Sequence, residues 1–239
     1  MILPTAPDIY AAIEATWPAA STRRVGPWNI RDGADGGKRV SAATLEGDYG
    51  GLAEAESAMR NVGQTPLIMV REGEAALDAA LADQGYRVID PVTLYVVQAH
   101  AIAAPAPRMV AFEVWPPLAI MADLWAEGGI GPARLAVMDR VHGSKTALFG
   151  RAQNRPAACA FVASAGDIAM IHALEVAPER RRNGMGATLT RAAADWAARN
   201  GATWLALAVT TANTEANALY AGLWMQPVGY YHYRMKEDP

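Results

Sequence analysis

The stretch that decides the fold is Leu174-Glu175-Val176-Ala177-Pro178-Glu179-Arg180-Arg181-Arg182-Asn183-Gly184-Met185-Gly186. Apolar residues alternate up to residue 176, which predicts a strand, and from residue 185 to 199 the period becomes helical. The first N–H groups of a helix lack internal partners and carry partial positive charge, so this end can bind an anion. Glycine allows close approach and arginine adds charge. The loop therefore predicts a pyrophosphate site.

Two common phosphate-binding loops do not fit this stretch. It has no third glycine for the Gly-x-Gly-x-x-Gly dinucleotide pattern, and no Gly-Lys-Ser/Thr follows it. It also lies late in the chain, after several strand candidates.

The surrounding pattern alternates helices and strands. We expect helices at 117–127, 133–141, 185–199 and 213–223, and strands at 145–151, 157–163, 167–176, 204–209 and 228–235. In strand 167–176 we expect Ile168, Met170, His172, Leu174 and Val176 to share one face. This order predicts an α/β domain, with a mixed α+β central sheet.

At this point a resemblance becomes specific. The opening stretch resembles the acetyl-CoA signature of the GNAT superfamily of N-acetyltransferases, a strand ending Leu-x-Val-x-Pro followed by Arg/Gln-x-x-Gly-x-Gly/Ala. A second block, Asn213-Thr214-Glu215-Ala216-Asn217-Ala218-Leu219-Tyr220, is similar to the family's Asn-x-x-Ala-x-x-Leu-Tyr helix. The resemblance implies a GNAT acyl-CoA N-acyltransferase fold, acetyl-CoA as cosubstrate without a metal, and an amine that attacks the thioester directly.

The resemblance also implies which residues bind acetyl-CoA. Pantetheine is expected between two splayed strands, one ending at Leu174 and Val176 and the other near Val209. The pyrophosphate is expected on the backbone of Arg181, Arg182, Asn183, Gly184, Met185 and Gly186. Asn213 and Asn217 match positions that contact CoA or cap the helix, and an N-cap role explains Asn213 by itself.

Three residues are candidates for proton transfer. Tyr220 matches the family tyrosine that protonates the leaving thiolate, although it also continues an apolar helix stripe. His172 lies in His-Ala-Leu-x-Val, which resembles serotonin N-acetyltransferases of this superfamily, and is a candidate base or a satisfied strand histidine. Glu175 is expected on the opposite face from His172, in an ion pair with Arg180 or Arg182, with a base role possible if a bulge inverts the register.

One position departs from the family pattern. The family often shows Leu-Gly-Phe after the tyrosine helix, where this chain has Leu223-Trp224-Met225. We therefore expect a different exit of the chain from that helix.

The N-terminal part has a related ending. Residues 101–107 lack charge, contain two prolines and predict a linker between domains 1–100 and 108–239. A helix running into Gly85-Tyr86 and a strand at 93–97 resemble the close of the same fold, after strand candidates 27–31, 39–44 and 66–70 and a helix at 51–61. We interpret residues 1–100 as a degenerate GNAT copy, as in tandem bacterial members, or else as an unrelated α/β cap. The segment 32–39 is read as a hairpin loop, with anion binding as the alternative.

Composition limits the remaining options. The 239 residues carry a net charge of −3, which gives no argument for nucleic acid, and one cysteine, which excludes an internal disulfide. No apolar run suggests a membrane span or signal peptide, so a cytoplasmic monomer or homodimer is expected. The alternatives to a small-amine acetyltransferase are a non-catalytic acyl-CoA sensor or scaffold, and an acetyltransferase acting on protein lysines or N-termini.

Overall fold

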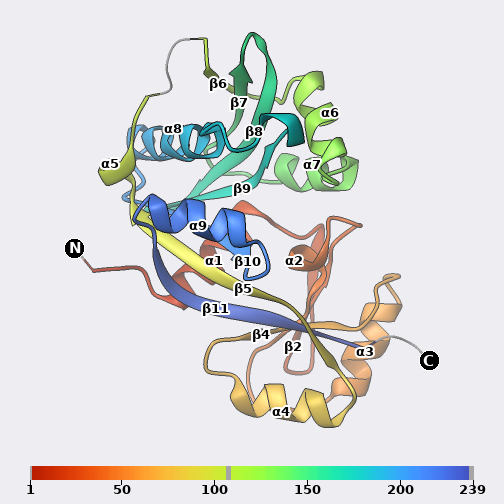
Figure 1. Ribbon diagram of the computed structural model, residues 1–239. Coiled ribbons are helices and arrows are strands. Elements are labelled where there is room, and N and C mark those ends of the chain that lie inside the picture. Colours follow the sequence, from red (N-terminus) through yellow and green to blue (C-terminus); the bar gives the residue numbers. More distant parts are fainter. Residues whose placement is uncertain (1, 106–108, 237–239) are drawn as a thin grey trace.

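The computed structural model describes residues 2–105 and 109–236 (Figure 1). Residues 106 and 107 of the expected linker therefore lie outside the described residues. The first part of the chain forms α1 (Ala6–Thr16), β1 (Ser21–Val25), β2 (Trp28–Asp32), α2 (Lys38–Ser41), β3 (Thr44–Leu45), α3 (Leu52–Arg60), β4 (Leu67–Arg71), α4 (Ala75–Asp83), β5 (Arg87–Gln98) and α5 (Ala99–Ile102). The second part forms β6 (Ala111–Val114), α6 (Ala119–Glu127), α7 (Pro132–Asp139), β7 (Lys145–Ala152), β8 (Arg155–Ala165), β9 (Ile168–Val176), the 3₁₀ turn Pro178–Arg180, α8 (Met185–Arg199), β10 (Trp204–Thr210), α9 (Thr214–Gly222) and β11 (Gln226–Met235).

The central sheet is mixed, which confirms the predicted fold class. Within the described ranges it has eight strands in the order β4-β11-β5-β10-β9-β8-β7-β6. Strands β9 and β10 run parallel, and the other neighbouring pairs are antiparallel. A smaller sheet pairs β1, β2 and β3.

Helices cover both faces of the central sheet (Figure 1). Helices α5, α8 and α9 pack on one face, where the expected α8 stripe of Met185, Leu189, Ala193 and Trp196 is buried. Helices α1, α6 and α7 contribute to the cores on the other face. Helix α8 has the predicted bounds, and Gly201 follows it in the left-handed conformation that a helix C-terminus requires.

Strands from the two parts of the chain pair with each other in the central sheet. The segments β4–α4–β5 and β10–α9–β11 are both strand–helix–strand units, and the last strand of each pairs with the first strand of the other. Strands β5 and β11 then pair with each other at the centre. Strand β5 thus lies inside the sheet of the second part, and α5, which contains the first residues of the expected linker, is packed against α8.

The first part differs from expectation at residues 39–44. The expected strand there is wrong, because residues 38–41 form the one-turn helix α2 and only Thr44 and Leu45 are extended. The turn buries Val40 and leaves Arg39 pointing toward the second part of the chain. The segment after residue 32 does join antiparallel strands, β2 and β3, but with α2 inside the connection.

The expected change of chain exit after α9 is also wrong. Trp224 has φ +61°, and Gly85 has φ +83° in the equivalent turn after α4. The chain therefore leaves α9 with the backbone conformation that glycine adopts after α4. Trp224 takes this left-handed conformation although it has a Cβ atom, which costs about 1–2 kcal/mol.

Replacing Trp224 with glycine should consequently stabilise the protein. Its side chain is 82% exposed, so little packing is lost, and we expect the free energy of unfolding to rise by about 1 kcal/mol in urea denaturation. Trp224→Ala is the matched control, since alanine keeps the left-handed strain. A destabilised Trp224→Gly variant would show instead that the indole makes contacts that stabilise the fold.

Candidate functional site

The site begins where the two parallel strands separate. Strands β9 and β10 pair at only three positions, ending at Met170 and Ala206. Beyond these residues β9 stays paired with β8 as far as Val176, and β10 stays paired with β5 as far as Thr210. The strands therefore diverge, as expected, and leave a wedge whose facing backbone groups are not paired across it.

A bulge in β9 changes which side chains face each other. Ala173 has φ +49°, and the register with β8 shifts between His172 and Glu175. The expected alternation along 168–176 is therefore wrong past residue 172, because the extra residue turns Leu174 and Val176 to the α8 face. Glu175 and His172 pair with Cys159 and Phe161, which share the opposite face of β8, so the expectation that they lie on opposite faces is also wrong.

Next to the wedge, the loop before α8 presents a row of free amides. The backbone N–H groups of residues 182–187 have no acceptor within the described part of the chain. Gly184 makes the turn into the helix with φ +75°. At Gly186 a Cβ would lie 3.0 Å from Leu219 Cδ2, so this glycine allows α8 to pack against α9. Six successive amides at a helix N-terminus are suited to binding the oxygens of a polyanion.

The three arginines of the loop have different hydrogen-bond and ion-pair partners. Arg180 Nη1 donates to Gln153 Oε1 at 2.7 Å, while Arg181 donates to Glu175 Oε1 and to the Val176 carbonyl, both at 3.1 Å. Arg182 is exposed and makes no ion pair with any described residue. Within the described residues two cations of the loop, Arg180 and Arg182, therefore have no carboxylate partner.

Tyr220 lies on α9 with its side chain turned into the core under α8. It is 6% exposed, and its hydroxyl has no hydrogen-bond partner among the described residues. Burial raises the pKa of Tyr220 to about 12, so the hydroxyl is protonated at neutral pH. A buried phenol in this state can donate one hydrogen bond.

The neighbours of Tyr220 come from both parts of the chain. Tyr95 of β5 packs against its ring at 6.1 Å and donates to Asn217 Oδ1 at 3.2 Å. Asn217 in turn donates to the Thr210 and Asn213 carbonyls, at 3.0 and 2.7 Å. Asn213 caps α9 by accepting from the Ala216 amide, which confirms the N-cap reading. The two asparagines therefore fix the β10–α9 turn that carries Tyr220.

His172 is enclosed on every side. Thr16 donates its hydroxyl proton to the Ala12 carbonyl, so it accepts from His172 Nε2 at 2.8 Å. The other ring nitrogen, Nδ1, then accepts from Arg39 Nη1 at 3.2 Å, and Trp17 stacks on the ring at 4.9 Å. Burial and the Arg39 cation lower the pKa of His172 well below its ordinary value. The imidazole is neutral and has no free lone pair to act as a base.

We accordingly expect His172 to stay uncharged through the physiological range. Below pH about 6.5 the unfolded chain binds a proton on this residue and the folded chain does not, so this residue reduces stability as the pH falls. In an NMR titration the ring protons of His172, assigned with His172→Gln, should show no midpoint between pH 5.5 and 8. A midpoint near 6.5 would contradict the enclosed geometry.

Glu175 lies at the outer end of the same face. Its side chain, 20% exposed, pairs with Arg181, so the expected pairing with Arg180 or Arg182 is wrong. The side-chain carbons lie against Gly128 at the end of α6. The bulge beside it is held by Trp125, whose buried indole donates to the Ala173 carbonyl at 2.7 Å. Glu175 is thus the one of the two predicted bases that reaches solvent next to the wedge.

Two residues of the first part of the chain also belong to this site, Arg39 and Tyr95. Tyr95 was not identified from the sequence, and Arg39 was singled out only as the last residue of segment 32–39, for which anion binding was the alternative. Among the described residues no group of three or more His, Cys, Asp or Glu side chains is placed to hold a metal, and no helix is long and apolar enough to cross a membrane.

Parallel strands that diverge beside free helix-terminal amides form an arrangement that suits an extended anionic ligand. Residues 120–223 match the model of the Acetyltransferase (GNAT) family. The chain is 26% identical over 236 residues to the uncharacterized N-acetyltransferase YobR of Bacillus subtilis, covering 93% of this chain and 95% of the relative. It resembles a GCN5-related N-acetyltransferase from Kribbella flavida with a TM-score of 0.73 at 18% identity, covering 100% and 98% of the two chains. A tandem GNAT protein from the clavulanic acid biosynthesis pathway matches with a TM-score of 0.64 at 18% identity, covering 95% and 86%.

Residues 120–223 therefore match the GNAT family, and the relatives that match nearly the whole chain support an acyltransferase of this kind.

Proposed function

We propose that this protein transfers an acetyl group from acetyl-CoA to an amine by direct attack. The observation that supports this most is the row of free amides at residues 182–187 beside the wedge between β9 and β10. The amides fit a pyrophosphate and the wedge fits an extended chain with amide groups. Bound acetyl-CoA would supply the acetyl group as a thioester.

In this proposal Tyr220 is the general acid. Its hydroxyl is protonated and has no hydrogen-bond partner among the described residues, so it is available to a thiolate that leaves at the wedge. Tyr95, Asn213 and Asn217 are positioning residues, because they hold the turn and the ring of Tyr220 rather than the ligand.

Glu175 is the better candidate for the base that accepts the proton of the amine. Its carboxylate reaches solvent on the same face as His172, whereas both nitrogens of His172 are already hydrogen-bonded. His172 then positions Arg39 and Thr16 and does not take the proton itself.

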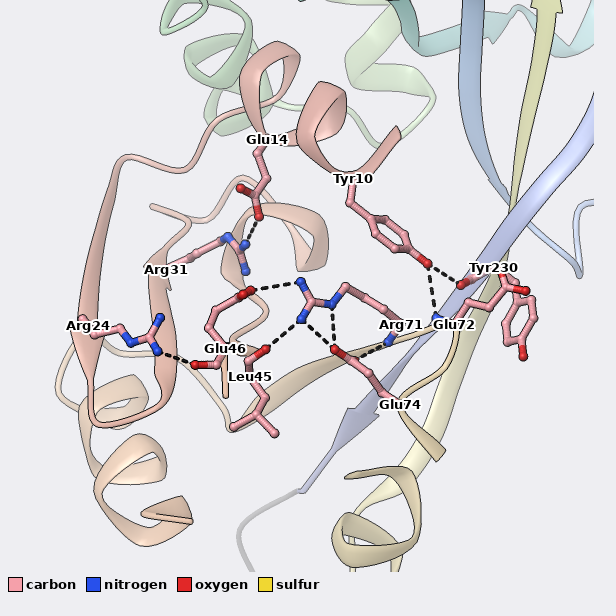
Figure 2. Close-up of polar contacts among 10 residues, drawn as sticks. All are labelled: Tyr10, Glu14, Arg24, Arg31, Leu45, Glu46, Arg71, Glu72, Glu74 and Tyr230. Atoms are coloured by element: carbon pink, nitrogen blue, oxygen red, sulfur yellow. Dashed lines mark hydrogen bonds and ion pairs between the residues drawn. The ribbon is translucent and has the colours of Figure 1, made fainter. Parts of the chain in front are cut away.

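We also propose that residues 1–100 are a degenerate copy of the fold that does not bind CoA in the usual way. Ala43, directly before β3, forms a single parallel bridge with Ile68 of β4, and beyond it β3 and β4 are not paired, as β9 and β10 are not beyond their last pair. Figure 2 shows the Arg71 side chain in this second wedge, where it donates to the Leu45 carbonyl at 2.7 Å and pairs with Glu46 and Glu74. Helix α3 begins after a left-handed Gly51, as α8 does after Gly184, but Glu46 and Asp48 precede it instead of arginines. Acidic residues at this end would repel a pyrophosphate.

The experiment that tests the proposal is a screen of amines with acetyl-CoA, read as release of free thiol and corrected for hydrolysis. We expect turnover with at least one small amine, and a fall of roughly 10²-fold or more in Glu175→Gln. Binding of acetyl-CoA without thiol release against small amines, lysine peptides and peptide N-termini would support the non-catalytic sensor. Turnover with peptides alone would support the protein acetyltransferase.

A further inference from the structure

The described part of the molecule contains a cavity away from the amides before α8. It has a volume of about 240 Å³ and lies between α1 and the strands β2, β3 and β4. Its walls include Tyr10, Trp17, Arg31, Arg39, Thr44 and Arg71. Because pockets for drug-sized ligands start at about 300 Å³, this cavity suits a smaller molecule.

Two of the three arginines in the wall are neutralised by carboxylates. Arg31 contacts Glu14, and Arg71 pairs with Glu46 and Glu74, as Figure 2 shows. The positive charges of these two side chains are therefore balanced within the protein.

Arg39 is the exception. It makes no ion pair with any described residue, and its guanidinium meets only neutral groups. It donates to His172 Nδ1 at 3.2 Å and the Ala208 carbonyl at 3.3 Å, and the Tyr231 and Tyr233 hydroxyls lie close to it. Its Nε is buried without a partner. A half-buried cation without a compensating anion is unfavourable, and so is a buried donor left without an acceptor.

Thr44 adds an independent observation at the same cavity. Its side chain is 1% exposed, and its Oγ1 has no partner among the described residues. Thr44 lies on β3 and Arg39 on α2, so two neighbouring elements each bring an unsatisfied polar group to one wall. Buried polar groups are otherwise nearly always hydrogen-bonded.

We propose that this cavity binds a small molecule through its oxyanion, a carboxylate or phosphate, held by Arg39 and Thr44. The oxyanion would neutralise the guanidinium and satisfy the hydroxyl. Arg39 also joins the cavity to the acyl site, because His172 lies on β9 and Ala208 on β10, each two residues past the last pair before the wedge. The molecule is either the carboxylate-bearing acceptor itself or a separate effector of the same chemistry.

Calorimetric titration of the full chain with glutamate, succinate and inorganic phosphate tests this binding. At least one probe should bind with a dissociation constant between micromolar and millimolar, while uncharged succinamide should not. Thr44→Val should weaken the binding about tenfold or more, and Arg39→Met should abolish it. Thr146→Val, another buried threonine but outside the cavity wall, is the matched control and should bind like the wild type.

The proposal is overturned if no probe binds, or if binding survives unchanged in both variants as an adventitious ion on the surface would. If Arg39→Met does not fold, Thr44→Val decides alone. The experiment measures binding and does not require acetyl transfer. A failure of the cavity proposal can therefore be distinguished from a failure of the proposed function. The two sources of the oxyanion are distinguished by assaying turnover in the presence of the probe. A probe that raises only the KM for the amine occupies the place of the acceptor's own carboxylate, and a probe that changes kcat acts as an effector.

Discussion

Tyr220→Phe should lower kcat by about 10²–10⁴-fold and leave the affinity for acetyl-CoA nearly unchanged. General acid catalysis contributes about this much, and the substitution removes only the hydroxyl. Because the hydroxyl has no partner among the described residues, its loss leaves no buried group unpaired, and the stability should hold. Turnover and acetyl-CoA binding are measured on the same preparation.

Tyr230→Phe is the matched control for this experiment. Tyr230 is 55% exposed on β11, and its hydroxyl likewise has no partner among the described residues. The control should keep full turnover. Equal turnover in Tyr220→Phe and the wild type would remove Tyr220 from the role of acid.

Asn183→Asp should weaken acetyl-CoA binding by roughly tenfold or more. The change keeps the shape of the side chain and places a negative charge among the free amides before α8, where a charge about 5 Å away costs on the order of 1–3 kcal/mol. An acidic residue at a helix N-terminus is favourable for the helix itself, so the melting temperature should not fall. The loss of affinity should shrink at high salt.

Asn61→Asp, at the exposed end of α3, is the control for the added charge. It should bind acetyl-CoA like the wild type. If Asn183→Asp also bound normally at low salt, the pyrophosphate would not lie on this loop.

The sequence predicted the second part of the fold well because its signals are local. The period change at Met185, the glycine after α8 and the asparagine before α9 each act within one turn of chain, and all three appear as expected. The bulge in β9 could not be predicted from alternation, because the extra residue at Ala173 is set by Trp125, which is distant in sequence. Helix α1 was not predicted, although Thr5 and Asp8, whose carboxylate accepts from the Thr5 amide, form a capping signal.

The sequence did not predict the contribution of the first part of the chain to the site, for a related reason. Arg39 meets a ring nitrogen of a residue 133 positions away, and Tyr95 meets an asparagine 122 positions away. Contacts of this kind arise because β5 pairs with β10 and β11 pairs with β4. No periodic pattern in the sequence predicts these long-range pairings. His172 was a reasonable candidate base by residue type, but its partners Thr16 and Arg39 lie in the first part and leave its ring fully hydrogen-bonded.

The most direct test of the central claim is an NMR titration of the backbone amides with acetyl-CoA. We predict that the largest shift changes fall on residues 182–187, with smaller changes along β9 and β10 past Met170 and Ala206. The amides at the start of α3, residues 50–54, should not respond. Shifts concentrated at residues 50–54, or no saturable shifts at 182–187, would contradict a single CoA site before α8.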